Sequence, residues 1–472
     1  MTEATPKATP AEALKSTLRW LVLAALVAAV WALGFEAEAS KGTVFIERFA
    51  QLALVALTLG AQRISMLYGI VVGVLGAFLA VALFQAQMAD FALIGKLFLK
   101  ALKMIVVPLI AFAVISAMTS LGDIRRIGRL GSRTVLYYLM TTAIAVTLGS
   151  ILVNIIEPGV GLEVGHTIPE KVANKTDMGL SDILFGFLHD NIFAAFTEGK
   201  MLPIILFCIV FGAVLTTLGE KGRGAIEACE GANAAMMKVV ELVLLLAPVG
   251  VFGLVAGRFG EALAAGDLWQ ELAAVRDYSL TVLLGLALHA FIVVPVILKV
   301  VTGRSPLAYA RGMATALMTA FSTASSAATI PLTMDAAIDN NNVDGRSAKF
   351  VIPLGATVNM DGTALYEAVA VIFIAQAAGI ELSLMQQLVV IITATLAAIG
   401  AAGIPQAGLV TMVIVLQAVN LPLAGVELIL AVDWLLDRFR TVVNVWGDAV
   451  GAAVVEPYAL EGDPSDPVAA SS

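Results

Sequence analysis

Long apolar segments separated by short polar ones dominate this chain. Apolar runs cover 18–34, 49–60, 65–86, 101–118, 134–156, 201–217, 236–257 and 279–298, and several more follow residue 350. A segment of about 20 apolar residues is long enough to cross a bilayer as a helix. A water-soluble α/β enzyme with buried helices would have fewer and shorter runs. The pattern therefore predicts an all-α membrane protein, a multi-span helical bundle.

Composition agrees with a membrane protein and narrows its partners. The chain is 60% hydrophobic and 14% charged, whereas soluble domains have about 45–50% apolar and about 25% charged residues. The net charge of −8 is spread without long runs, so no nucleic-acid partner is expected. The two cysteines, Cys208 and Cys229, are too few to form a disulfide framework, and their spacing is not that of metal ligands. The first sixteen residues do not resemble a cleavable signal peptide, so 18–34 is expected to be an anchor or span.

Basic residues predict the orientation in the membrane. Two short loops, one before 134–156 and one after 279–298, are rich in them: Arg125, Arg126, Arg129 and Arg133, then Lys299, Arg304 and Arg311. Short loops rich in Lys and Arg stay in the cytoplasm. The longer loop 158–200 is mixed in charge and is expected outside, and 219–224 is expected to be a short cytoplasmic turn. We expect a multi-pass protein of the plasma (inner) membrane.

One sequence pattern occurs twice in the last third of the chain. Ala-Ala-x-Ile-Pro ends at Pro331 and again at Pro405, and each copy is followed by a span with Asn-x-x-Gly, at 359–362 and 444–447. Interrupted helices in duplicated positions are typical of secondary transporters, whose ligands bind where the helices break. Backbone freed by Pro and Gly cannot face lipid. Close helix packing explains the small residues, but it does not explain the prolines or the polar residues that follow them.

The span 351–376 carries Asn359, Asp361, Thr363 and Glu367. An ionised carboxylate at mid-membrane costs at least about 2.5–3.5 kcal/mol, so two in one span need partners. Asn359 and Asp361 offer the hard oxygens that an alkali cation prefers, and we expect Gly362 to break the helix and expose carbonyls. We interpret this part of the span as a sodium site.

Glu367 lies farther along the same span, in an apolar helical stretch. A buried glutamate without a fixed cation favours its neutral form, so it can bind and release a proton near neutral pH. We expect Glu367 to carry a proton. The alternative is a neutral glutamate that only hydrogen-bonds a neighbouring span.

The span 430–455 presents one polar helix face. Asp433 starts this stripe, and at spacings of three and four it continues with Asp437, Arg440, Thr441, Asn444 and Asp448. Such a face suits a zwitterion, because an arginine can hold a carboxylate, an aspartate can hold an ammonium group, and Asn444 can bind the α-carboxylate. Asp448 can complete another sodium site. The alternative is an internal Asp437–Arg440 salt bridge that closes the bundle.

His289 lies in an apolar span, where a polar residue suggests function by default. No partner residue recurs nearby, so a structural role is favoured. An intramembrane serine hydrolase that uses Ser325 or Ser326 with His289 is a second hypothesis, but no set of nucleophile, base and orienting group is apparent.

Four motifs together resemble the dicarboxylate/amino acid:cation symporters, specifically the excitatory glutamate transporters and their prokaryotic relatives. They are Ser-Ser-Ala-Ala-Thr-Ile-Pro at 325–331, Asn-Met-Asp-Gly-Thr at 359–363, Gly-Ile-Pro-Gln-Ala-Gly at 403–408, and Asp-Arg-Phe-Arg-Thr-Val-Val-Asn-Val-Trp-Gly-Asp at 437–448. The resemblance runs from about residue 65 to residue 456. It implies a homotrimer with a scaffold and an elevator-type transport domain, and two re-entrant hairpins near 306–340 and 383–420. It also implies an N-terminal extension over 1–64, first spans over 65–300, a transport core over 301–456 and a tail over 457–472.

The same resemblance implies the site residues. Substrate contacts fall on Ser325, Ser326, Thr363, Gly408, Asp437, Arg440, Thr441 and Asn444. Sodium sites fall on Tyr138, Thr141, Thr142, Asn359 and Asp361; on Gly355, Asn359, Asn444 and Asp448; and on Thr357 with carbonyls of Ala398, Ile399 and Ala401. Glu367 matches the proton-carrying glutamate of the proton- and potassium-coupled members.

The resemblance favours sodium-coupled uptake of glutamate or aspartate across the lipid membrane, not an enzyme. Neutral amino acid carriers lack the arginine at position 440, and Asp437 favours an amino acid over a plain dicarboxylate. A proton-driven symporter of dicarboxylates or other amino acids stays as the alternative, and a chloride-permeable anion conductance can coexist with transport. The sequence leaves open the choice between glutamate and aspartate, the ion stoichiometry and potassium counter-transport.

Overall fold

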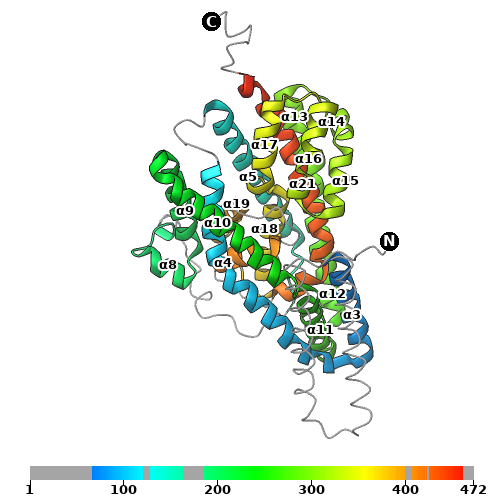
Figure 1. Ribbon diagram of the computed structural model, residues 1–472. Helices are drawn as coiled ribbons and strands as arrows, with labels where there is room; N and C mark the ends of the chain where they lie inside the picture. Colours follow the sequence, from blue (N-terminus) through cyan, green and yellow to red (C-terminus); the bar gives the residue numbers. More distant parts are fainter. Residues whose placement is uncertain are drawn as a thin grey trace, which may run out of the picture. The chain divides into compact units, whose positions relative to one another are not determined.

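The computed structural model describes residues 66–120, 128–162, 185–398, 407–419, 421 and 425–460. These residues form helices joined by turns, with no strand among them (Figure 1). Within these ranges, five helices are long and apolar enough to cross a membrane: Gln87–Ser120, Arg129–Ile156, Ala247–Ala265, Leu268–Thr302 and Gly345–Ala377. The predicted all-α membrane fold is confirmed. The predicted extension over 1–64 lies outside the described residues.

The helices are numbered along the chain. The first half contains α3 (Met66–Phe84), the 3₁₀ helix η2 (Gln85–Phe91), α4 (Ala92–Ser120), α5 (Gly128–Ile156), α8 (Ile192–Glu198), α9 (Met201–Thr217) and α10 (Glu220–Leu244). The next part contains α11 (Ala247–Ala265), α12 (Leu268–Leu288), the π-helical turn η3 (His289–Val293), α13 (Val294–Thr302), α14 (Pro306–Gly312), α15 (Ala314–Thr323), α16 (Ser326–Asp335) and the π-helical turn η4 (Ala336–Asn340). The last part contains α17 (Gly345–Val358), α18 (Asp361–Ala377), α19 (Leu384–Ala398), α20 (Ala407–Ala418) and α21 (Val426–Leu460).

Two sequence predictions about segment ends are wrong. The apolar run 236–257 is not one helix, because the chain turns between α10 and α11. Pro248 lies in the first turn of α11, where proline's missing N–H leaves no helix bond unmade. The predicted polar turn at 219–224 is confined to its start: Gly219 takes a left-handed conformation, with φ of +58°, and α10 begins at the next residue.

The chain divides into two compact units, and the first comprises 1–104 and 238–271. Its described core pairs α11 with α3 and η2, and a row of glycines lines α11. A methyl group on Gly253 would lie 2.8 Å from the carbonyl oxygen of Phe91, and one on Gly257 would lie 2.6 Å from the side chain of Ala92. Small residues therefore let these backbones approach closely, as in other membrane helix pairs.

The second unit comprises 105–237 and 272–472 and holds all the predicted site residues that the structure describes. Helix α18 packs against α5, α19, α20 and α21, and α17 also packs on α21. Two helical hairpins lie in this unit: α15 pairs with α16, and α19 pairs with α20. These pairs occupy the two regions predicted as hairpins. The tip of the second hairpin, 399–406, lies outside the described residues.

The first hairpin turns at Ala324 and Ser325. Ala324 has φ of +50°, a left-handed conformation that ends α15, and Ser325 begins α16 by accepting a hydrogen bond from the amide of Ala328 at 3.2 Å. Short polar side chains at a helix start satisfy amides that have no partner inside the helix. The local sequence therefore accounts for this turn.

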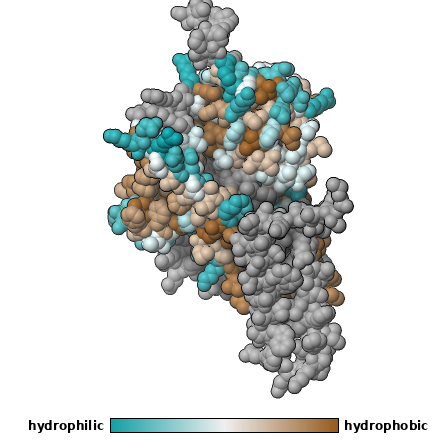
Figure 2. All heavy atoms as spheres, viewed as in Figure 1, coloured by the Kyte–Doolittle hydropathy of each residue, from teal (hydrophilic) through white to brown (hydrophobic). Residues whose placement is uncertain are grey.

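The surface of the second unit has both hydrophilic and apolar areas. Figure 2 shows hydrophilic side chains near the turn from α13 to α14 and the start of α17, above a mostly apolar area. Exposed apolar side chains follow α5, among them Leu136, Ile151 and Ile155. An exposed apolar stripe on a long helix suits contact with lipid.

Candidate functional site

The site begins where a transmembrane helix is interrupted. Helix α17 ends at Val358 and α18 starts at Asp361, so Asn359 and Met360 leave the helix. Gly362 was expected to cause the break, but it lies inside α18. A side chain there would meet the carbonyl oxygen of Arg440 at 2.5 Å. Gly362 is therefore required by the close approach of α18 to α21, and the interruption precedes it.

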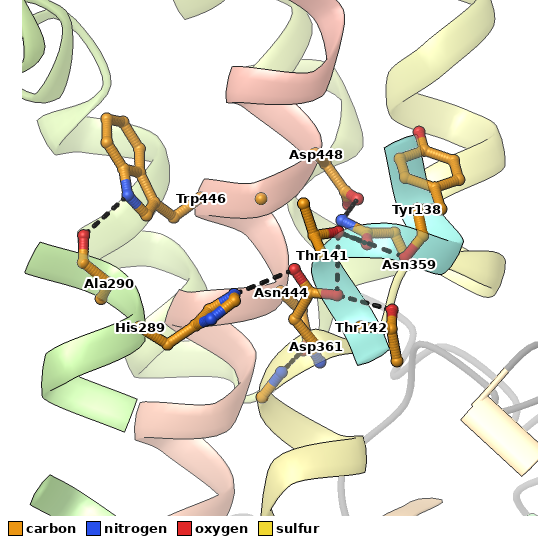
Figure 3. Close-up of polar contacts among 12 residues, drawn as sticks. Tyr138, Thr141, Thr142, His289, Ala290, Asn359, Asp361, Asn444, Trp446 and Asp448 are labelled. Atoms are coloured by element: carbon orange, nitrogen blue, oxygen red, sulfur yellow. Dashed lines mark hydrogen bonds and ion pairs between the residues drawn. The ribbon is translucent and has the colours of Figure 1, made fainter. Parts of the chain in front are cut away.

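An oxygen cluster surrounds this interruption, made of Tyr138, Thr141, Thr142, Asn359, Asp361 and Asp448. Figure 3 shows them coming from α5, the α17–α18 break and α21. The hydroxyl of Tyr138 donates to the carbonyl of Val351 at 2.7 Å. The hydroxyl of Thr142 donates to Asp361 Oδ1 at 2.6 Å, and that of Thr141 lies 3.3 Å from the same oxygen. Asn359 Nδ2 donates to Asp448 Oδ1 at 3.0 Å. The sequence placed these side chains far apart along the chain, and the fold brings them together.

The oxygen cluster has the chemistry of an alkali-cation site. Asp361 and Asp448 are both buried, and no lysine or arginine pairs with either within the described ranges. Hydroxyl, amide and carboxylate oxygens are the hard ligands that such cations prefer. An uncompensated charge in a membrane interior is costly, so a bound cation would relieve the carboxylates. The residues present fit sodium.

The other two predicted sodium sets are only partly assembled by described residues. Gly355 lies directly against Asp448, because an added methyl group would fall 2.2 Å from Oδ1. Any larger residue would displace that carboxylate. Thr357 donates within its own helix, to the carbonyl of Leu354 at 3.0 Å. Ile399 and Ala401, predicted to supply carbonyls beside Ala398, lie outside the described residues.

His289 is a partner that the sequence did not identify. Its Nε2 lies 3.1 Å from Asp361 Oδ2, and both side chains are fully buried. The prediction of a structural role assumed that His289 has no partner, and the contact with Asp361 shows that this assumption is wrong. The spacing of 72 residues hides this contact in the sequence. Neither ring nitrogen meets a serine hydroxyl among the described residues, so the hydrolase hypothesis gains no support.

A second group of side chains surrounds Arg440, which is completely buried. Arg440 Nη2 donates to Asp437 Oδ1 at 2.7 Å and lies 3.2 Å from Asp433 Oδ1. The predicted Asp437–Arg440 pair is therefore present. Nε and Nη1 have no hydrogen-bond partner within the described part of the chain. A buried guanidinium with unused N–H groups can donate hydrogen bonds to a further carboxylate.

Tyr366 completes the surroundings of Arg440 and was also missed. The guanidinium carbon lies 3.8 Å from the centre of the Tyr366 ring, within the range of a cation–π interaction. A methyl group on Gly408 would lie 2.6 Å from Nη1, so a glycine is needed there. In the sequence, the only sign of this role was that Tyr366 precedes Glu367. Which residue the tyrosine ring faces depends on how α18 packs against α21.

Asn444 of α21 is hydrogen-bonded to the first turn of α18. Gly362 donates its amide to Asn444 Oδ1 at 2.8 Å, and Asn444 Nδ2 donates to Thr363 Oγ1 at 3.1 Å. The neighbouring Asp361 belongs to the oxygen cluster. The first residues of α18 therefore contact both groups, so a change in one group can reach the other.

The first hairpin tip also lies against α21. Arg438 Nη1 donates to the carbonyl oxygens of Phe321 and Ser322 at 2.6 and 2.9 Å. These carbonyls belong to the last turn of α15, which has no helix partners for them. Ser325 and Ser326 at the tip are both buried. Thr441 donates to the carbonyl of Asp437 within α21 at 2.8 Å.

Glu367 is fully buried in α18. Neither of its carboxyl oxygens has a hydrogen-bond partner among the described residues. Its helix packs against α20, the second arm of the second hairpin.

Comparisons with known proteins agree with these motifs. Residues 63–457 match the model of the sodium:dicarboxylate symporter family. The human "Excitatory amino acid transporter 3" is 40% identical over 417 residues, which cover 78% of this chain and 79% of that protein. The "Excitatory amino acid transporter" of Caenorhabditis elegans is 41% identical over 409 residues, covering 77% of this chain and 80% of the relative. That of Onchocerca volvulus is 40% identical, with 77% and 82% covered.

Proposed function

This chain belongs to the sodium:dicarboxylate symporter family, and from that membership we propose that it takes up glutamate or aspartate together with sodium. The observation that supports an acidic amino acid as the substrate is the buried Arg440. Two of its nitrogens have no partner among the described residues, and Asp437 lies beside it. The relatives named for excitatory amino acids support the same substrate class.

The proposed substrate pose follows from charge. The side-chain carboxylate of the amino acid meets Arg440, and the α-ammonium group meets Asp437. Thr363, Thr441 and Asn444 complete the polar wall, with Ser325, Ser326 and Gly408 contributed by the two hairpins. A zwitterion with an extra carboxylate satisfies each buried charge, and an unpaired buried charge is strongly unfavourable.

Sodium is proposed to bind in the oxygen cluster at Asp361. The cation neutralises carboxylates that would otherwise cross the membrane uncompensated. Asn444 contacts the first turn of α18 beside Asp361, which supports coupling between cation and substrate. Further sodium ions are proposed near Asp448 and near Thr357.

Glu367 is proposed to carry a proton during each cycle. Its complete burial without a hydrogen-bond partner among the described residues supports this role, since an ionised carboxylate there would be uncompensated in an apolar interior. Glu367→Gln should therefore remove the pH dependence of net uptake while exchange of internal and external substrate continues. An unchanged pH profile of net uptake would contradict the proposal. We further propose that potassium is transported in the opposite direction when Glu367 has released its proton.

The proposed large-scale mechanism is an elevator movement of a transport domain in a homotrimer. The two hairpins, α15–α16 and α19–α20, would be re-entrant and act as gates. Only a loaded, closed domain crosses at low cost, because open polar groups in an apolar barrier are unfavourable. An anion conductance is proposed to accompany transport.

The experiment is uptake of radiolabelled aspartate and glutamate into liposomes that contain the purified protein. We expect uptake to require an inward sodium gradient and to resist competition by succinate. Arg440→Cys should abolish uptake of acidic substrates, while Thr302→Val, which removes hydrogen bonds to Leu298 and Arg304 at the end of α13, should retain it. Uptake that proceeds without sodium, or that succinate blocks as well as aspartate does, would overturn the proposal in favour of the dicarboxylate alternative.

A further inference from the structure

We propose that His289 is a positioning residue for Asp361: it holds one carboxylate oxygen so that the other faces the cation-binding side of the oxygen cluster. The inference rests on the proposed function, because it takes the oxygen cluster to bind sodium. It concerns a side chain that supplies no ligand itself.

The two oxygens of Asp361 have different neighbours. His289 Nε2 lies 3.1 Å from Oδ2, whereas Oδ1 receives the Thr142 hydroxyl at 2.6 Å and lies 3.3 Å from that of Thr141 (Figure 3). A carboxylate only accepts hydrogen bonds, so the nitrogen facing it carries the hydrogen. Rotation of the carboxylate would break the histidine bond and the threonine bond together. The imidazole therefore fixes which oxygen a cation meets.

A wide helical turn sets the position of His289. The amide of Val294 bonds to the carbonyl of His289, five residues earlier, instead of to that of Ala290. Pro295 follows and has no N–H to offer. The π-turn is thus built around a proline, and such single turns often lie at functional sites. The extra residue changes the direction of the side chains on either side of the turn.

The same turn is tied to α21. Because the Val294 amide bonds elsewhere and Pro295 has none, the carbonyl of Ala290 lacks its usual backbone donor. Trp446 Nε1 donates to that carbonyl at 3.1 Å (Figure 3). Trp446 lies two residues before Asp448, which belongs to the oxygen cluster. Both sides of the cluster are therefore linked to the π-turn, one through His289 and one through the backbone of α21.

A histidine that merely filled space would have different consequences. Removing it would lower the stability of the folded protein with and without sodium to the same extent. A positioning role predicts a selective change in sodium affinity, since partners of metal-binding side chains typically alter affinity about 10- to 100-fold. The distinguishing quantity is the sodium concentration at half-saturation without substrate.

The experiment titrates purified full-length protein with sodium chloride, balanced by choline chloride, in the absence of amino acids. Thermal unfolding and tryptophan fluorescence report binding independently of transport. We expect His289→Leu, which keeps volume but removes the donor, to raise the half-saturating sodium concentration about tenfold or more. His289→Gln keeps an N–H donor and should stay within about threefold of the wild type.

The matched control is Thr302→Val, which removes hydrogen bonds to Leu298 and Arg304 at the end of α13 in the same unit. It should lower the unfolding temperature and leave the sodium midpoint unchanged. A wild-type midpoint in His289→Leu, or an equal loss in both His289 variants, overturns the positioning role. If the wild type itself shows no sodium response, the proposed function fails instead.

A second measurement covers the case in which His289→Leu does not fold. The wild-type protein is labelled with ¹⁵N in the imidazole rings of its three histidines, and the His289 signal is assigned by its absence in His289→Gln. Saturating sodium should shift the His289 Nε2 resonance, and choline should not. A resonance that sodium leaves unchanged overturns the inference.

Discussion

At the scale of single residues, burial decides how the charged groups behave. Arg440 has no contact with water and is held by Asp437, Asp433 and the face of Tyr366. Both aspartates contact Nη2 and the guanidinium lies over the tyrosine ring, so Nε and Nη1 point in a set direction. A lysine has no planar group to stack or to bind a carboxylate in this way.

The ring of Tyr366 is expected to contribute to substrate affinity through Arg440. A desolvated cation–π contact is worth about 2 kcal/mol. Tyr366→Leu should therefore raise the KM for aspartate roughly tenfold or more, by the conversion of about 1.4 kcal/mol per tenfold. Tyr366→Phe keeps the ring face and serves as the matched control. Concentration-dependent uptake measures both variants, and equal KM values in the Leu and Phe variants would show that the ring contributes nothing.

At the scale of elements, close approaches of backbone define the site. Helix α18 crosses α21 at Gly362, and the α17–α18 interruption lies two residues earlier. Glycine is needed because a rigid backbone carbonyl, not a flexible side chain, occupies the space. Gly355 is needed for a different reason, because a larger residue would displace the side chain of Asp448.

Gly362→Ala is expected to destabilise the folded protein by about 1–3 kcal/mol, because helix packing must open to admit the methyl group. Gly231→Ala is the control: it lies in α10 with nothing within 4 Å of the new atom, and alanine favours helix by about 0.5–1 kcal/mol. Thermal unfolding of the purified variants in sodium compares them. If Gly362→Ala unfolds no earlier than Gly231→Ala, the close crossing of α18 and α21 is not a constraint.

At the scale of the whole molecule, transport needs the cation and substrate to depend on each other. The start of α18 contacts the oxygen cluster through Asp361 and lies against the backbone of Arg440 at Gly362. Thermodynamic linkage makes any such coupling reciprocal.

Sodium and aspartate should therefore change each other's affinity by one common factor, expected at about tenfold or more. Equilibrium binding of labelled aspartate at several sodium concentrations gives one factor, and sodium titration with and without aspartate gives the other. Asn444→Ala removes the hydrogen bonds that join α21 to the first turn of α18 and should bring both factors toward one. Independent affinities in the wild type would contradict shared use of α18.

Much of this protein follows from local sequence. The apolar runs fix helices because a backbone in lipid must satisfy its own hydrogen bonds, so α5 and α9 appear where their runs predict. The polar stripe on α21 also follows from sequence, since a helix repeats every 3.6 residues whatever surrounds it. The family resemblance rested on such local motifs.

Contacts between distant segments were decided only by the tertiary structure. His289 and Asp361 are 72 residues apart, and Tyr366 faces Arg440 only because α18 crosses α21 at a glycine. Periodicity fixes which face of a helix a residue occupies, but not which other helix that face meets. The sequence by itself therefore determined the spans and the chemical inventory of the site, while the packing of helices decided which charges and rings meet.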